Sequence, residues 1–250
     1  MKKAWKVIIS EIKLADGILE IVDARCPNET RSEKLERLLE RMEKPFWIVM
    51  NKTDLVPKEF SERAKNFLKQ NTKAVDVVFV SAKVFYGYNI LRRSIKEFFK
   101  GNKARLCVVG FPNVGKSSII NAIAKESKVS VAPKPGHTKG KQWIRVGNKL
   151  FISDMPGVLP KEFAAEIWRE ILFPKDIENA AFTLLEKISK AEGTNFSMLY
   201  GVHPEPSEET LVKIAKKLNF LKSGGEPDSS RAAQRIIEDW NSGKLTAWWL

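Results

Sequence analysis

The stretch Gly110-Phe111-Pro112-Asn113-Val114-Gly115-Lys116-Ser117 fits the pattern G-x-x-x-x-G-K-S, and it decides the fold. The run from Arg105 to Val109 before it reads as a strand, and Ser117 to Ala124 reads as a helix. In such a unit the loop N–H groups and the helix N-terminus face phosphate oxygens, and the serine hydroxyl ligates Mg²⁺. We therefore predict a phosphate-binding loop whose nucleotide contacts come from Pro112, Asn113, Val114, Gly115, Lys116, Ser117 and Ser118.

Composition limits the class of protein. The chain has 250 residues, 43% of them hydrophobic, which suffices for one full core and a smaller second unit. Cys26 and Cys107 lie far apart without metal-ligand spacing, so we interpret them as apolar filler in a reduced, cytoplasmic protein. No segment reaches the roughly 18 uninterrupted apolar residues of a membrane helix, and we expect no membrane association.

The net charge of +13 is unevenly distributed. Residues 1–157 carry the whole basic excess, whereas residues 158–250 are slightly acidic. A positive field of this kind favours a polyanionic partner for the first part of the chain, although it is also compatible with simple solubility.

Apolar runs alternate with amphipathic segments up to about residue 158, and the pattern is helical from there on. We expect strands at 18–23, 46–50, 77–80 and 105–109, a hairpin of 142–146 with 150–153, and C-terminal helices at 176–190, 207–218 and 229–241. This alternation predicts an α/β fold: a three-layer α/β/α domain with a mostly parallel sheet at residues 1–172, and a mainly helical domain at 173–250. A monomer is expected.

The segment Asn51-Lys52-Thr53-Asp54 fits N-K-x-D at the end of a buried strand, where open α/β sheets bind ligands. The Asp54 carboxylate can accept both guanine donors, N1–H and N2–H₂, whereas adenine offers no such pair. We expect Asn51 to pin the loop and the Lys52 stem to lie over the ring. Taken alone, this short match could equally be a turn that ends a strand.

Two further segments complete a guanine-nucleotide site. Backbone N–H groups of Ser81-Ala82-Lys83, after the third strand, could bind the guanine carbonyl. Asp154-Met155-Pro156-Gly157 fits D-x-x-G, in which Asp154 would hold Mg²⁺ through water and the Gly157 N–H would meet the γ-phosphate. Thr138 could contribute a hydroxyl to Mg²⁺, the alternative being a turn hydroxyl. The predicted metal ligands are thus Ser117, Thr138 and Asp154.

The motifs run in the order base, base, phosphate, switch, switch, whereas GTPases usually begin with the phosphate loop. This order resembles the circularly permuted GTPases of the YlqF/RbgA ribosome-assembly family. The resemblance rests on D-A-R-C-P (23–27), N-K-T-D (51–54), S-A-K (81–83), G-F-P-N-V-G-K-S-S (110–118), P-G-H-T-K-G-K-Q-W (135–143) and D-M-P-G (154–157). It implies a P-loop GTPase fold that hydrolyses GTP to GDP and acts as a switch in large ribosomal subunit assembly, with the subunit precursor and rRNA as partners.

Hydrolysis is expected to be slow without an activator. Many GTPases place a glutamine after D-x-x-G to orient the attacking water, and here that residue is Val158. Related GTPases with asparagine at the position of Asn113 bind K⁺ between the phosphates, although Asn113 could also merely shape the loop. We expect the catalytic groups to be Lys116, Asn113, Thr138 and Gly157.

Two other functions stay open at this point. One is a tRNA- or membrane-associated GTPase with a different client. The other is a GTP-gated RNA- or protein-binding scaffold with little intrinsic hydrolysis and a non-ribosomal client. Basic residues of the 133–145 segment would contact RNA phosphates or form a solvated basic loop: Lys134, Lys139, Lys141 and Arg145.

Overall fold

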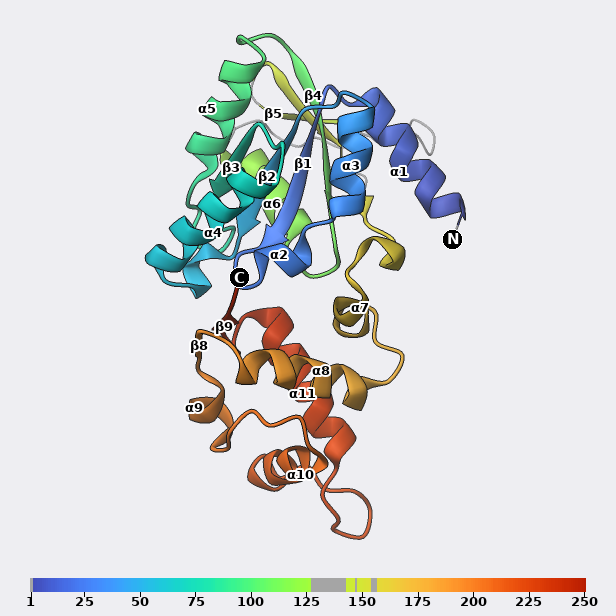
Figure 1. The fold of residues 1–250 in the computed structure, drawn as a ribbon, viewed down its shortest axis with the longest axis vertical. Coiled ribbons are helices and arrows are strands. Elements are labelled where there is room, and N and C mark those ends of the chain that lie inside the picture. Colours follow the sequence, from blue (N-terminus) through green and yellow to red (C-terminus); the bar gives the residue numbers. More distant parts are fainter. Residues whose placement is uncertain (1, 127–142, 147, 154–156) are drawn as a thin grey trace. The chain divides into compact units, whose positions relative to one another are not determined.

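The computed structural model describes residues 2–126, 143–146, 148–153 and 157–250, and its ribbon is drawn in Figure 1. Two compact units divide the chain into Met1–Ala164 and Ala165–Leu250. This division falls before the domain boundary expected between residues 172 and 173, because helix α7 (Glu166–Leu172) packs against α8 (Ile177–Ser189) of the second unit.

The first unit contains a seven-stranded sheet whose path runs β3-β2-β1-β4-β6-β5, with β7 paired to β4. All neighbours are parallel except β5 and β6, which form the predicted hairpin. The mostly parallel sheet of an α/β fold is therefore confirmed. Its strands are β1 (Gly17–Asp23), β2 (Phe46–Asn51), β3 (Asp76–Phe79), β4 (Ala104–Gly110), β5 (Trp143–Val146), β6 (Leu150–Ser153) and β7 (Gly157–Val158).

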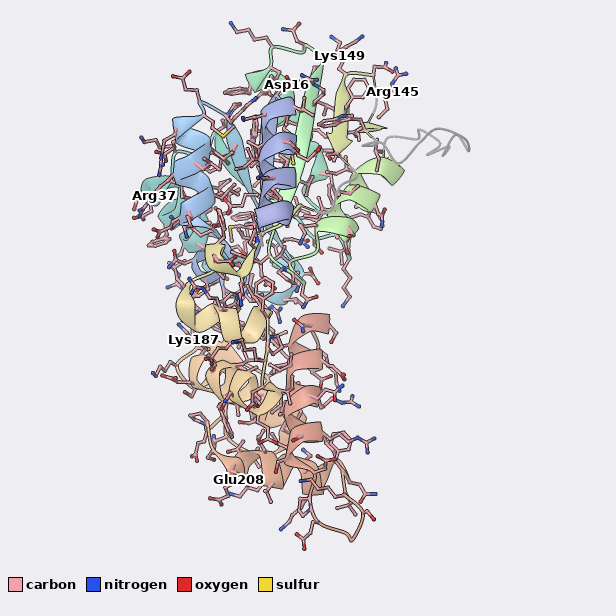
Figure 2. All side chains as sticks on the ribbon, turned by 90° about the vertical axis from the view of Figure 1, so that its right-hand side faces the viewer. Asp16, Arg37, Arg145, Lys149, Lys187 and Glu208 are labelled. Carbon is pink, nitrogen blue, oxygen red and sulfur yellow. The ribbon has the colours of Figure 1, made fainter. Side chains whose placement is uncertain are left out.

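Helices cover both faces of this sheet. Because crossovers between parallel strands are right-handed and the chain reverses its direction of travel after β3, α3 and α4 lie on one face and α5 and α6 on the other. Figures 1 and 2 show α1 beside α3. The helices of this unit are α1 (Lys2–Leu14), α2 (Pro27–Thr30), α3 (Glu33–Arg41), η1 (Thr53–Leu55), α4 (Lys58–Asn71), α5 (Tyr88–Phe98), α6 (Lys116–Glu126) and η2 (Lys161–Phe163).

Two inner strands of the sheet, β1 and β2, are buried along their whole length, as expected for a sheet covered on both faces. One residue departs from the apolar pattern. Glu20 in the middle of β1 is fully buried, and its Oε1 accepts a 2.7 Å hydrogen bond from the Ser32 amide. Burial, together with the nearby Glu36 carboxylate, raises the pKa of Glu20 well above its usual value.

The second unit is mainly helical. It contains α7, α8, α9 (Phe196–Tyr200), α10 (Glu208–Lys217) and α11 (Ser229–Ser242), with a small antiparallel pair of β8 (Gly193–Thr194) and β9 (Ala247–Trp248). Its core is aromatic: Trp168 lies edge-on to Trp240 and Trp249, and the latter two rings stack with their centroids 5.6 Å apart. Among the described residues no helix is long and apolar enough to cross a membrane.

Candidate functional site

The order of strands reverses between β1 and β4, and open α/β sheets bind ligands where the carboxyl ends of such strands meet. The phosphate-loop sequence begins where β4 ends, at Gly110, and α6 starts at Lys116. The first N–H groups of α6 have no intrahelical acceptor and are available to an anion. Ser117 and Ser118 are exposed in this first turn.

Close packing fixes the shape of the loop. Gly110 and Gly115 are both required there: a Cβ on Gly110 would come within 2.6 Å of the Ile21 carbonyl oxygen, and one on Gly115 would collide with the Asn51 side-chain amide. Gly115 has φ +95°, which L side chains rarely adopt. Asn113 is exposed and left-handed as well, with φ +62°.

Lys116 folds back into its own loop. The residue is only 8% exposed, and its ammonium donates a 2.5 Å hydrogen bond to the Phe111 carbonyl oxygen. Burial lowers the pKa of Lys116 to about 8. The loop therefore holds a positive charge that is only weakly favoured in the absence of an anion, and an incoming phosphate would supply the missing counter-charge.

Asn51, the last residue of β2, links three loops. Its Nδ2 donates a 2.8 Å hydrogen bond to the Val114 carbonyl oxygen of the phosphate loop. Its Oδ1 accepts a 3.2 Å bond from the Ala82 amide in the Ser81–Lys83 segment. The N-K-x-D segment, the S-A-K segment and the phosphate loop are thus brought together at one edge of the sheet.

Asp54 lies in η1, on the solvent side of this junction. One carboxylate oxygen accepts a 2.6 Å hydrogen bond from the Ser81 hydroxyl, which orients the group. The other oxygen has no hydrogen-bond partner within the described part of the chain, and the residue is exposed. Thr53 anchors the same turn through its hydroxyl, which donates to the Val80 carbonyl oxygen at 2.9 Å. Lys83 is exposed at the end of the S-A-K segment.

The D-x-x-G segment is only partly described. Strand β7 places the Gly157 backbone opposite Val109 and Val158 opposite Gly110, directly beside the start of the phosphate loop. The predicted groups Thr138 and Asp154, and the lysines at 134, 139 and 141, lie outside the described residues. Among the described residues no group of three or more His, Cys, Asp or Glu side chains could hold a metal ion.

Of the three predicted metal ligands, only Ser117 belongs to the described residues. The Ser117 hydroxyl stands exposed at the first turn of α6, next to the free helix N–H groups. Hydroxyl and carboxylate oxygens are the ligands that Mg²⁺ prefers. Ser117, with Thr138 and Asp154, would therefore hold the ion that neutralises charge on the phosphates.

Arg145, one of the basic residues proposed to contact RNA, lies in the predicted hairpin and not in the loop before it. It is an exposed residue of β5, in register with Phe151 of β6. Figure 2 shows Arg145 and Lys149 at the end of the sheet where Asp16 precedes β1, which is where the parallel strands begin. This end is opposite to the one that bears the phosphate loop.

Sequence reasoning gave no role to two residues of the site, Asp23 and Arg25, although their segment is one of the motifs that carry the family resemblance. Asp23 ends β1 in register with Asn51, and its carboxylate contacts both the Arg25 guanidinium and the Lys52 ammonium. The sequence offered one signal for these residues: the D-A-R segment stands at the end of β1, as the N-K-x-D segment stands at the end of β2. A pairing across two strands depends on their register, which the sequence alone does not display.

The comparisons with known proteins agree with this geometry. The family model described as a 50S ribosome-binding GTPase matches residues 105–217. An uncharacterised GTP-binding protein of Methanocaldococcus jannaschii is 38% identical over 98% of this chain and 66% of its own length. The nucleolar GTP-binding protein 2 of Schizosaccharomyces pombe is 30% identical over 98% of this chain, which spans 47% of that protein.

Two solved structures share the fold and nearly the full length. The GDP-bound structure of YlqF superposes with a TM-score of 0.72 at 22% identity, covering 98% of each chain. The GNP-bound structure of YlqF from T. maritima gives a TM-score of 0.67 at 25% identity, covering 97% of this chain and 94% of that one. These likenesses show that the chain has the fold of YlqF and that it is similar over nearly its whole length to GTP-binding proteins.

Proposed function

We propose that the chain binds GTP, hydrolyses it slowly to GDP, and acts as a nucleotide-dependent switch in assembly of the large ribosomal subunit. The observation that carries this proposal is the Asn51 side chain. Its two hydrogen bonds join the N-K-x-D segment, the S-A-K segment and the phosphate loop into one continuous edge. A guanine ring and a polyphosphate chain have complementary donors and acceptors along such an edge.

The base is read by Asp54, whose free oxygen and whose Ser81-bound oxygen face the two guanine donors. Lys52 covers the ring with its stem. In the S-A-K segment the Ser81 and Ala82 N–H groups already donate to the Tyr86 carbonyl oxygen and to Asn51 Oδ1, so the guanine carbonyl would meet the Lys83 N–H or displace one of these bonds. The phosphates bind the backbone from Pro112 to Ser118, the Lys116 ammonium and, at the γ-position, the Gly157 N–H.

Hydrolysis rests on Lys116, Asn113, Thr138 and Gly157, with Mg²⁺ held by Ser117, Thr138 and Asp154. A potassium ion at Asn113 would add positive charge between the phosphates. Because Val158 neither donates nor accepts a hydrogen bond, another group must orient the attacking water, and turnover rises only when a partner supplies it.

The ribosomal role is supported by the names of the relatives. The matching family model is called a 50S ribosome-binding GTPase, and several relatives are called nucleolar GTP-binding proteins or nuclear/nucleolar GTPases. Basic residues at 134, 139 and 141 would contact rRNA phosphates. We propose a monomer that works on a large-subunit precursor in the cytoplasm.

The base assignment is tested by exchanging Asp54→Asn and measuring affinity for guanine and xanthine nucleotides. We expect affinity for GDP to fall at least tenfold and affinity for the xanthine analogue to rise, because the asparagine amide can donate to the xanthine 2-oxygen. Unchanged preference for guanine in a folded variant would remove Asp54 as the base reader.

The switch role is tested with ribosomal subunits. We expect the chain to co-sediment with large subunits when a non-hydrolysable GTP analogue is bound, to dissociate with GDP, and to hydrolyse GTP faster in the presence of subunits. If subunits neither stimulate hydrolysis nor co-sediment with the chain, a scaffold with a non-ribosomal client becomes the better account of its function.

A further inference from the structure

The carboxylate of Asp23 lies at the centre of a buried cluster of charges. Asp23 is 4% exposed, and its Oδ2 is 2.8 Å from Arg25 Nη2 and 2.9 Å from Lys52 Nζ. Its Oδ1 accepts hydrogen bonds from Arg25 Nε at 3.0 Å and from the Arg25 amide at 3.1 Å. Burial alone would raise the pKa of Asp23, but the charges of Arg25 and Lys52 hold it well below the usual range.

Arg25 fixes the position of this carboxylate. Its side chain is fully buried and uses Nε and Nη2 on the two carboxylate oxygens, the paired geometry that gives Arg–carboxylate contacts their specificity. The backbone adds a second connection, because the Ala24 amide donates a 2.8 Å hydrogen bond to the Asn51 carbonyl oxygen. The end of β1 is thus attached to the N-K-x-D segment at consecutive residues.

Lys52 depends on this attachment. Its backbone is left-handed, with φ +64°, a conformation that disfavours any residue with a Cβ. A lysine side chain in solution samples many rotamers, and its four-carbon stem is ordered only where the ammonium is held. Here the ammonium is held by a single carboxylate on the neighbouring strand, and the residue is only 16% exposed at its side chain.

We propose that Asp23 is a positioning residue for guanine-nucleotide binding. It holds the Lys52 ammonium so that the alkyl stem is already in place to cover the purine ring, and Arg25 in turn holds Asp23. This inference rests on the proposed function, because it assumes that the N-K-x-D segment binds the base. It assigns a role to the D-A-R segment at the end of β1 that neither the phosphate loop nor Asp54 supplies.

A double-mutant cycle separates this role from a purely structural one. The variants are Asp23→Asn, Lys52→Met and the two combined, and the measurement is the dissociation constant for GDP, with folding checked by thermal unfolding. If Asp23 acts through Lys52, each single variant weakens GDP binding about tenfold or more, and the combined variant binds no more than about twofold weaker than Lys52→Met alone.

The matched control is Glu36→Gln. Glu36 is another nearly buried carboxylate with an arginine partner, Arg31, whose Nε lies 2.8 Å from its Oε1. Glu36→Gln should leave the dissociation constant for GDP unchanged. Should Asp23→Asn fail to fold, Asp23→Glu takes its place in the cycle, since it keeps the charge but displaces the oxygens.

Two results would overturn the proposal. One is a combined variant whose loss of GDP affinity is the product of the two single losses, and the other is a folded Asp23 variant with unchanged GDP affinity. Either result would mean that Asp23 does not act through Lys52, but it would not affect the proposal that the unmodified chain binds guanine nucleotides. A chain that binds GDP no better than ADP would overturn the proposed function and this inference together, so the two failures are distinguishable.

Discussion

The buried Glu20 should make the first unit less stable as pH rises, and Glu20→Gln should remove that dependence. Glu20 is fully buried, one oxygen accepts from Ser32, and the other has no hydrogen-bond partner among the described residues. Glutamine has the same shape, keeps the acceptor for the Ser32 amide and is neutral at every pH. The substitution therefore removes the ionisation of Glu20 without changing the shape of the side chain or its hydrogen bond with Ser32.

The direction follows from the raised pKa. In the unfolded chain Glu20 ionises near its usual value of about 4.3, whereas in the folded chain it stays protonated well above that. Stability contributed by the protonated form is fully present below the unfolded pKa and is lost as pH rises toward the folded pKa. Each pH unit in this window costs about 1.4 kcal/mol. Between pH 4 and pH 7 the loss is at most about 3–4 kcal/mol.

Hydrogen exchange of the β1 and β2 amides measures this directly, because it reports the free energy of opening the first unit without contribution from the second. We expect Glu20→Gln and the unmodified chain to protect these amides equally at pH 4. At pH 7 the variant should be more stable than the unmodified chain, by no more than the upper bound of about 3–4 kcal/mol. Glu33→Gln, at a carboxylate whose side chain is 59% exposed, is the control and should show no such difference. A stability difference that is the same at both pH values would refute the reasoning.

The remaining predictions concern the phosphate loop and the second unit. Burial lowers the pKa of Lys116 to about 8, and phosphate favours its charged form, so affinity for GDP should fall as pH rises above 8, by up to about tenfold per pH unit. In titrations from pH 7 to 9.5, Lys116→Arg, which stays charged, should flatten this profile. If the variant keeps the same slope, Lys116 is not its cause. Gly115→Ala should abolish GDP binding at micromolar protein in calorimetry because its Cβ has no room, whereas Gly224→Ala, equally left-handed but in open space, should leave affinity unchanged; retained binding by Gly115→Ala would show that the loop yields. Trp249→Ala should destabilise the second unit by about 3–5 kcal/mol, measured by urea unfolding followed by hydrogen exchange. Met198→Ala, at a 77% exposed position, is the control and should have no effect. Equal effects of the two variants would mean that the aromatic cluster is not the core of the second unit.

Sequence patterns located the strand ends because these are local. The G-x-x-x-x-G-K-S segment lies between β4 and α6 as expected, since glycines, an apolar run and a helical period all lie within one short stretch. The mostly parallel sheet also agreed with expectation, because strands that alternate with helices favour parallel pairing through right-handed crossovers.

What sequence could not predict depends on register and on packing between distant segments. Asp23 faces Lys52 only because β1 and β2 pair with Asp23 opposite Asn51. The predicted hairpin put Arg145 in a strand, but the sequence did not show that this strand places Arg145 at the end of the sheet opposite to the phosphate loop. The division before α7 is similarly decided by the packing of Trp168 on Trp240, which are far apart in the sequence.

Circular permutation leaves the site intact because each loop depends on a strand end and on its neighbours, and neither depends on chain order. What it changes is the connection that follows the γ-phosphate segment. From Gly157 the chain runs through β7 and η2 and reaches the second unit at Ala165. η2 is attached to the first unit, since the Ser32 hydroxyl donates a 3.1 Å hydrogen bond to the Phe163 carbonyl oxygen. Any nucleotide-dependent movement at Gly157 would reach the second unit through the short segment 158–164. During such a movement the hydrogen bond between Ser32 and Phe163 would either persist or be broken.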